Sequence, residues 1–176
     1  MKSTQLAAVV GLNSAKMSGR HGKSFVDCAG VALVNGGRIF LIRPFYDYRP
    51  QNYAIPKGHV EPGEDPMSTA KREFEEETGI SLGDRELVPL VKVYTRIEPT
   101  VVKRVHVFKA LGDGSETYKC SNISPVGSPE NAYGGYIDYD SARMLITNYQ
   151  IPIVDRLLDE QMSSFETFYD QRSGLQ

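Results

Sequence analysis

The segment from residue 58 to residue 80 constrains the fold of this chain most, because it joins a glycine-bracketed loop to a strongly acidic helix. Asp65 suits a helix N-cap, and Pro66 suits the first helical turn. Gly79 suits a left-handed C-cap, which glycine adopts without steric cost. The spacing of these residues predicts a helix over 66–78.

Three carboxylates share one face of this expected helix. Glu73, Glu76 and Glu77 lie at positions i, i+3 and i+4, which fall within roughly 100° of arc. Like charges at this spacing cost a bare helix about 0.2–0.5 kcal/mol per pair. One reading of the run is a solvated helix face. The other is a binding site for a divalent cation, which would remove the repulsion, and carboxylate oxygens suit Mg²⁺ or Mn²⁺.

The surrounding residues extend the acidic cluster into a longer pattern. Pro56, Gly58 and Gly63 bracket the loop before the helix, so backbone carbonyls near Gly58 can face the same ion. The pattern reads G-x5-E-x7-R-E-φ-x-E-E-x-G-φ, where φ is apolar, and each specified position up to Ile80 is filled. It resembles the Nudix box, the signature of the Nudix hydrolase superfamily.

The resemblance implies a loop–helix–loop that holds Mg²⁺, with Mn²⁺ as an alternative. It implies that Arg72 orients the carboxylates through a charge-assisted hydrogen bond to Glu64. Phe74 should face the core, whereas Glu75, about 200° around the helix from Glu73, should face solvent. The implied metal ligands are the carboxylates of Glu73, Glu76 and Glu77 and the carbonyl of Gly58.

The chemistry that this resemblance implies is hydrolysis of a phosphoanhydride in a nucleoside diphosphate linked to another group. Metal ions held by the box would clamp the phosphates and lower the pKa of a water molecule. A general base must then accept a proton from that water. The candidates are Glu64 and Glu77 within the box, followed by Glu130 in the loop before the last expected strand. The alternative for Glu130 is an ordinary solvated side chain.

The substrate class is suggested by residues 55–65, IPKGHVEPGED. This phrase resembles the asymmetric diadenosine tetraphosphate hydrolases and the related diphosphoinositol polyphosphate phosphohydrolases. The resemblance makes Lys57 a candidate phosphate contact, and Lys103, at the start of an expected strand, a second one. The alternatives are a solvated loop side chain for Lys57 and an ordinary sheet-edge lysine for Lys103. His106, on the same strand, is expected to be packed or exposed rather than catalytic.

The base-binding residue of those hydrolases is not fully reproduced here. Their pattern near the last strand resembles E-x3-Y-x-W, with a tyrosine that stacks on adenine. Residues 130–136 read ENAYGGY, so Gly134 occupies the tyrosine's position and Tyr133 lies one residue early. Tyr133 is therefore either a shifted stacking residue or a cover for the edge of the core. Tyr46 and Tyr48 are alternative stacking residues.

Other activities within the same family stay open. They include hydrolysis of (d)NTPs or of diphosphoinositol polyphosphates, and removal of pyrophosphate or a cap from RNA 5′ ends. The basic segment 20–23 leaves the RNA role open, but no RNA-binding motif supports it. ADP-ribose hydrolysis ranks lower, because Thr95 stands where those enzymes usually place a proline. A non-catalytic nucleotide-sensing module is a further alternative, although such modules typically lose box glutamates and this chain keeps all of them.

Composition narrows the class of protein. The net charge of −2 argues against a general nucleic-acid binder held by phosphate neutralisation, although a local basic patch is compatible with it. The two cysteines, Cys28 and Cys120, suit a reducing compartment, so we expect a cytoplasmic protein without disulfides. No segment approaches 18 apolar residues, so no membrane span is expected. The expected partner is a small nucleotide substrate, and the oligomeric state is left open.

The order of expected elements predicts a mixed β-sheet with helices on both sides, an α/β/α sandwich of the Nudix fold. Residues 1–24 are expected to form a flexible arm, 25–162 the domain and 163–176 a loose tail. Strands are predicted at 25–34, 38–44, 53–55, 86–98, 101–111 and 136–139, with a hairpin turn at 35–37. Besides the acidic helix, helices are predicted at 140–147 and 150–162.

Overall fold

The computed structural model describes residues 23–45, 49, 51–119 and 130–173, with side chains placed as far as Ser164. Six strands form one sheet in the order β4-β5-β1-β2-β6, and β3 pairs with β1 beside that path. The pairing of β1 with β5 is parallel and the other pairings are antiparallel, so the sheet is mixed as predicted. The strands are β1 (Ser24–Asn35), β2 (Arg38–Pro44), β3 (Lys57–His59), β4 (Val88–Glu98), β5 (Val101–Leu111) and β6 (Asn131–Asp138).

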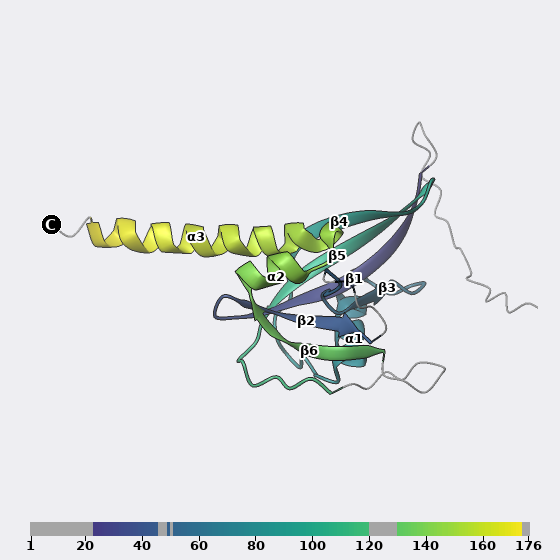
Figure 1. Cartoon of the computed structure of the whole chain (residues 1–176), viewed down its shortest axis with the longest axis horizontal. Coiled ribbons are helices and arrows are strands. Elements are labelled where there is room, and N and C mark those ends of the chain that lie inside the picture. Colours follow the sequence, from purple (N-terminus) through teal and green to yellow (C-terminus); the bar gives the residue numbers. More distant parts are fainter. Residues whose placement is uncertain (1–22, 46–48, 50, 120–129, 174–176) are drawn as a thin grey trace, which may run out of the picture.

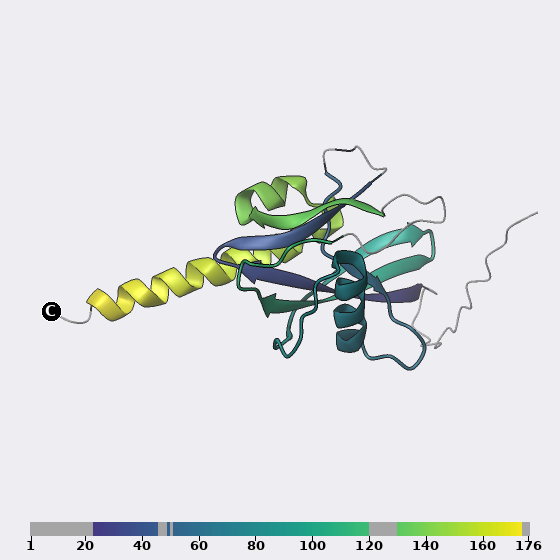
Figure 2. The same cartoon turned by 90° about the horizontal axis from the view of Figure 1, so that it is seen from below.

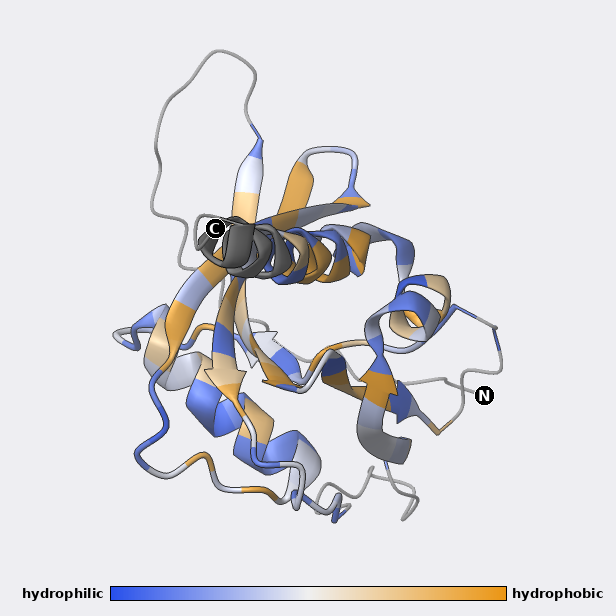
Figure 3. Ribbon diagram, turned by 90° about the vertical axis from the view of Figure 1, so that its left-hand side faces the viewer, coloured by the Kyte–Doolittle hydropathy of each residue, from blue (hydrophilic) through white to orange (hydrophobic). Residues whose placement is uncertain are grey.

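Helices cover both faces of this sheet, which confirms the predicted sandwich (Figures 1 and 2). Helix α1 (Pro66–Thr78) packs on one face, chiefly against β1. Helix α2 (Tyr139–Leu145), a short 3-10 turn at Asn148–Gln150 and helix α3 (Ile151–Ser173) lie on the other. Figure 3 shows apolar residues concentrated on the strands and on the helix surfaces that meet them.

Two apolar clusters fill the two interfaces. The α1 cluster includes Phe74 of the helix with Phe40 and Leu33 of the sheet. The opposite cluster includes Ile153 and Leu157 of α3. Strand β1 contributes to both clusters, and its residues from Cys28 to Val34 are buried without interruption. A continuous apolar strand is what a sheet covered on both faces requires, because neither side of the strand meets water.

Local sequence rules account for most of the boundaries. The hairpin turn between β1 and β2 is confirmed, with Gly36 and Gly37 at φ values of 52° and 78°. Positive φ at consecutive turn residues is what a tight hairpin demands and glycine tolerates.

Three boundaries differ from the prediction by more than two residues. The short strand expected at 53–55 lies at β3 instead, because Lys57–His59 pair with β1, whereas Tyr53 and Ala54 form only isolated bridges. Strand β6 begins at Asn131 rather than residue 136, since both glycines of the Gly-Gly pair lie in the ladder opposite β2. Helix α3 runs to Ser173, past the expected end at residue 162.

Several expectations fall on parts of the chain outside the description. These are the arm over residues 1–22, the candidate stacking residues Tyr46 and Tyr48, and Cys120. No helix in the described part of the chain is both long and apolar enough to cross a membrane.

Candidate functional site

Helix α1 presents the acidic residues, and its two ends are fixed by the caps that the sequence predicts. The Asp65 carboxylate accepts hydrogen bonds from the backbone N–H groups of Met67 and Ser68, at 2.9 and 3.1 Å. Gly79 adopts a left-handed conformation, with φ of 67°, and its N–H donates to the Glu75 carbonyl at 2.8 Å. These caps satisfy backbone groups that a bare helix leaves unpaired, so the helix holds its register on the sheet.

Arg72 is the centre of the carboxylate cluster. Its guanidinium forms a bidentate ion pair with Glu64, with hydrogen bonds of 3.1 and 3.0 Å, as the sequence resemblance implied. The same group donates to Glu73 at 2.7 Å and to Glu76 at 3.2 Å, and also to the carbonyl of His59. The hydrogen bond from Arg72 lowers the pKa of Glu64 to about 2, so Glu64 stays ionised and firmly held.

Glu77 has a different environment from the other acidic residues. Its carboxylate accepts a hydrogen bond from the backbone N–H of Lys57 at 2.7 Å, which ties α1 to β3. Burial raises the pKa of Glu77 to about 7; the charge of Lys57 and that hydrogen bond oppose the rise, and the carboxylates of Glu73 and Glu130 add to it. A carboxyl group with a pKa near 7 can exchange a proton at neutral pH.

Glu130 lies on the same side of the molecule as the box. It is exposed directly before β6, and its charge acts on Glu77. Its backbone carbonyl accepts a hydrogen bond from Phe45 at 2.9 Å. Two of the three candidate general bases, Glu77 and Glu130, are thus linked by the charge of Glu130, which acts on Glu77.

Position 58 has no room for a side chain and therefore requires glycine. It pairs with Ala29 in the β1–β3 ladder, and a Cβ placed on it would overlap the carboxylate of Glu73. The backbone of β3 and this side chain of α1 are thus in direct contact, so any side chain at position 58 would displace a candidate ligand.

The donor set fits a hard divalent cation in its chemistry, because it consists of carboxylate oxygens beside a glycine backbone. Within the described parts of the chain, no three His, Cys, Asp or Glu side chains converge closely enough to hold a metal ion. The reason is visible in the contacts: Glu73 and Glu76 turn toward Arg72, and Glu77 turns toward Lys57. Binding an ion would therefore require these carboxylates to exchange present partners for it.

Two candidate phosphate-binding lysines lie on the sheet face opposite α1. The registers pair Lys57 with Gly30 and Lys103 with Val26, and strand alternation places both lysines on the face of Cys28. The charges of both lysines act on the Cys28 thiol. Burial raises the pKa of this thiol, and the positive charges of Lys103 and Lys57 oppose that rise. The two lysines thus flank β1 on the same face of the sheet, opposite positions 30 and 26, although 46 positions separate them in the sequence.

Tyr133 stands at the end of β6 opposite Arg43 of β2. Its partly exposed ring meets Tyr53 edge-on, with centroids 5.9 Å apart, and the Arg43 guanidinium lies 5.9 Å from the Tyr53 ring centroid. Spacing in the sequence pointed to Tyr133 but not to Arg43 or Tyr53, because the grouping depends on the β2–β6 register.

Gly134 cannot be replaced by a stacking residue without a rearrangement. A Cβ on Gly134 would overlap the ring of Tyr118, whose hydroxyl donates to the Asn131 carbonyl at 3.0 Å. The loop before the undescribed residues thus occupies the position that a tyrosine side chain would need. Spacing in the sequence carried no sign of this contact.

Known proteins with similar sequences place this domain among related chains. A family model described as NUDIX domain matches residues 25–121. An RNA pyrophosphohydrolase of Rhizobium meliloti (strain 1021) is 40% identical over 60 residues, which cover 30% of this chain and 36% of that protein. One of Dinoroseobacter shibae is 33% identical over 81 residues, covering 44% of this chain and 50% of that protein. The chain thus spans between a third and a half of the length of these relatives.

Solved structures show the same fold. A C. elegans Ap4A hydrolase binary complex has a TM-score of 0.61 at 19% identity, covering 78% of this chain and 98% of that one. The E. coli ORF135 protein has a TM-score of 0.60 at 16% identity, covering 79% of this chain and 92% of that one.

Proposed function

This chain belongs to the NUDIX domain family, and we propose that it hydrolyses a phosphoanhydride bond of a nucleotide with the help of Mg²⁺, or Mn²⁺ in its place. The observation that carries the proposal is the complete carboxylate set on one face of α1, Glu73, Glu76 and Glu77. Glu73 and Glu76 contact Arg72, and Glu73 also lies against Gly58. Glu77 accepts a hydrogen bond from the N–H of Lys57, the residue before Gly58. A helix that needed only solubility would gain nothing from this arrangement, since the carboxylates repel one another.

The residues that would hold the cation are Glu73, Glu76 and Glu77, with the carbonyl of Gly58. When bound, such an ion supplies positive charge to phosphate oxygens and makes water more acidic. Arg72 contributes by fixing Glu73 and Glu76, and Glu64 fixes Arg72 in turn. Lys57 adds positive charge next to the box, since its charge acts on Glu77, and Lys103 adds positive charge on the sheet face opposite α1.

The electrostatics of the site narrow the choice of general base. Glu64 is a weak base, because Arg72 holds its pKa at about 2. Glu77 and Glu130 are the other candidates: burial raises the pKa of Glu77 to about 7 in the absence of the cation, and the charge of Glu130, directly before β6, acts on Glu77. A group with a pKa close to the operating pH is the most effective acceptor of a proton.

The proposed substrate is a dinucleoside polyphosphate, cleaved asymmetrically. The phrase over residues 55–65 supports this class, and so does the partly exposed ring of Tyr133 beside Tyr53. An aromatic ring that stacks on a base is worth about 1–3 kcal/mol. A second candidate substrate is the 5′ end of an RNA, favoured by the local identity to curated RNA pyrophosphohydrolases.

The test is a product analysis with Mg²⁺ over a panel of diadenosine tetraphosphate, dNTPs, ADP-ribose, diphosphoinositol phosphates and 5′-triphosphate RNA. We expect ATP plus AMP from the tetraphosphate, at rates well above those for the other compounds. Faster release of pyrophosphate from the RNA would select the second candidate. Absence of metal-dependent turnover on every compound would overturn the proposal and favour a nucleotide-sensing module.

A further inference from the structure

Strands β1, β4 and β5 extend past α1 (Figure 1). Their exposed face there is rich in aromatic and basic side chains. The registers place Tyr94 opposite Arg104, Lys92 opposite His106, and both Phe25 and Arg96 opposite Val102. Paired residues in a ladder share one face of the sheet, so these side chains lie on the α1 side. We call this surface the strand-end face, and its members are Phe25, Lys92, Tyr94, Arg96, Arg104 and His106.

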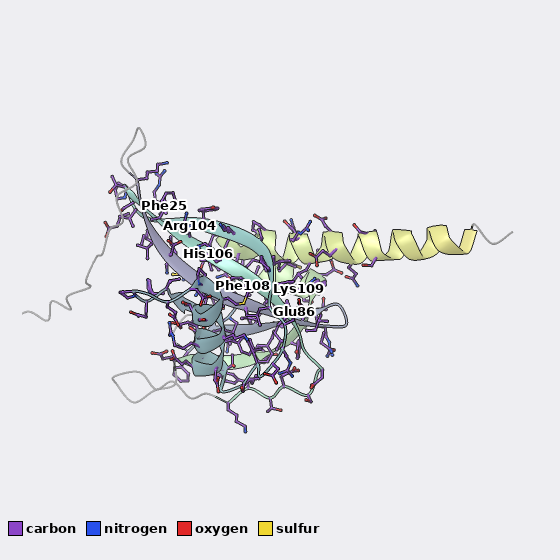
Figure 4. The ribbon with its side chains drawn as sticks, turned by 180° about the vertical axis from the view of Figure 1, so that it is seen from behind. Phe25, Glu86, Arg104, His106, Phe108 and Lys109 are labelled. Atoms are coloured by element: carbon purple, nitrogen blue, oxygen red, sulfur yellow. The ribbon has the colours of Figure 1, made fainter. Side chains whose placement is uncertain are left out.

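The centre of the strand-end face is rigidly built. Arg104 donates two hydrogen bonds to the Asp27 carboxylate, at 2.6 and 2.8 Å, and a ring nitrogen of His106 lies 2.9 Å from the same carboxylate. The Arg104 guanidinium also lies 5.0 Å from the centroid of the Phe25 ring. Figure 4 shows Phe25, Arg104 and His106 following one another along this end of β1 and β5. Arg104 is therefore fixed as a flat surface beside an aromatic ring.

The aromatic residues on this face are exposed, unlike the aromatic residues of the core. Phe25 and Tyr94 keep 50% and 51% of their surface accessible, and neither belongs to an apolar cluster. Lys92 and Arg96 are exposed on the same side of β4. The face carries three cationic side chains, and Asp27 beside it carries the one negative charge. The cations are Lys92, Arg96 and Arg104. The surface thus offers ring faces together with positive charge, although the whole chain has a net charge of −2.

We propose that the strand-end face binds single-stranded RNA, with bases stacked on Phe25 and Tyr94 and phosphates near Lys92 and Arg96. Stacking rings beside a cationic track are the features by which proteins hold unpaired strands. An acidic peptide would use the charges but not the two rings, and an apolar partner would leave the cations without partners. This proposal rests on the second candidate function, since it supplies a surface for the RNA body behind the 5′ end.

The position of the face fits that role. The carbonyl of Asp27 accepts a hydrogen bond from the N–H of Val60 at 3.1 Å, and Val60 opens the loop that carries Glu64. The strand-end face therefore borders the loop of the acidic site, while Lys57 and Lys103 lie on the other face of the sheet. An RNA strand that crosses the loop would contact the strand-end face and the acidic site at once.

The proposal is tested by fluorescence anisotropy with the full chain and a labelled single-stranded RNA that carries a 5′-hydroxyl, without divalent cations. We expect Phe25→Ala and Tyr94→Ala each to weaken binding about tenfold or more, because each removes a stacking surface. Arg96→Ala should lower the salt dependence of log K by about 0.7, the value of one phosphate contact on a single strand. Arg156→Ala is the matched control, because this arginine is 54% exposed on α3 and lies outside the face.

The same assay contains the results that would overturn the proposal. Absence of binding, or equal affinity of the wild type, Phe25→Ala and Tyr94→Ala, would remove the face from RNA binding. Equal affinity for a duplex would contradict base stacking, and tighter binding of the matching single-stranded DNA would contradict the choice of RNA. A 5′-hydroxyl strand has no phosphoanhydride, so these outcomes are independent of whether the chain hydrolyses any nucleotide. Hydrolysis of a dinucleoside polyphosphate should be unchanged in Tyr94→Ala.

Discussion

At the scale of single residues, the shared use of Arg72 decides how the acidic cluster is held. One guanidinium contacts Glu64, Glu73 and Glu76, and it therefore reduces the repulsion among carboxylates that the helix spacing imposes. The bond between Arg72 and Glu64 was predicted from the sequence. The separate environment of Glu77 was not, because it depends on burial against Lys57 and on the position of Glu130, 53 residues further along the chain.

Glu76→Gln should lower metal-dependent turnover by at least about 100-fold while the protein stays folded. Residues that merely support a metal ligand already cost about 10–100-fold when changed, so a ligand should cost no less. The side chain of Glu76 is 49% exposed, and exposed substitutions usually alter stability by no more than about 0.5 kcal/mol. Steady-state kinetics with Mg²⁺ and a thermal melt measure the two effects.

Glu75→Gln is the matched control for that variant. Glu75 is the preceding residue, carries the same charge and is exposed on another side of α1. Its variant should retain near-normal turnover. Equal losses in Glu75→Gln and Glu76→Gln would show that net charge, and not ligation, is responsible.

At the scale of elements, the sequence predicted the helices and strands better than their mutual contacts. The caps of α1 and the β1–β2 hairpin depend on neighbouring residues, so local rules located them. Strand β3 was misplaced by a few residues, since its pairing with β1 is decided by a partner about 30 positions away. The approach of Tyr118 to Gly134 was invisible for the same reason, and so was the grouping of Arg43, Tyr53 and Tyr133.

The contact between Tyr118 and β6 predicts a non-additive pair of mutations. Gly134→Ala should destabilise the protein by about 1–3 kcal/mol, because its Cβ would overlap the Tyr118 ring. In a Tyr118→Ala background the same substitution should cost much less, since the overlapping ring is gone. Urea denaturation of the four proteins gives the coupling energy. Strict additivity would show that the ring moves away freely.

The Asp27–Arg104 pair joins β1 to β5 and predicts a pH-dependent stability. The hydrogen bond from Arg104 holds the pKa of Asp27 below its ordinary value of 3.8, and His106 acts in the same direction against the opposing effect of burial. A lowered native pKa gives stability that is present above pH 3.8 and is lost as the pH falls through the native value.

The difference in free energy of unfolding between wild type and Asp27→Asn should therefore be largest near neutral pH and shrink below about pH 4. Urea denaturation at a series of pH values measures it. In an Arg104→Gln background the Asp27→Asn difference should be smaller at neutral pH, because the main partner is missing. A difference that grows as the pH falls would have the wrong sign for this pair.

At the scale of the whole molecule, one sheet separates two apolar clusters. The layered architecture was predictable, because the order of strands and helices allows few other arrangements. The allocation of residues to each cluster was not, since it depends on register and a shift of one residue exchanges the two faces. Strand β1 lies in both clusters, so the two halves of the interior share a buried element.

A shared central strand predicts one cooperative unfolding transition. Phe74→Ala in the α1 cluster should cost about 3–5 kcal/mol and Leu157→Ala in the α3 cluster about 2–5 kcal/mol, because each leaves a cavity in a packed interior. Both variants should shift the same single transition when circular dichroism and tyrosine fluorescence are followed together. Met144→Ala, on an exposed side chain of α2, is the control and should shift it little. Two separated transitions in either core variant would show that the clusters unfold independently.

The parallel pairing of β1 with β5 also sets an order in time. Asp27 and Arg104 are 77 positions apart, and the intervening chain contains the hairpin, the acidic helix and β4. Closing so long a loop is entropically costly and slow compared with forming local contacts. Helix α1 is synthesised before β5, so the proposed ligands of the cation precede Lys103 in the growing chain. A chain stopped at residue 100 would carry these proposed ligands but would lack one of the lysines proposed to receive the phosphates.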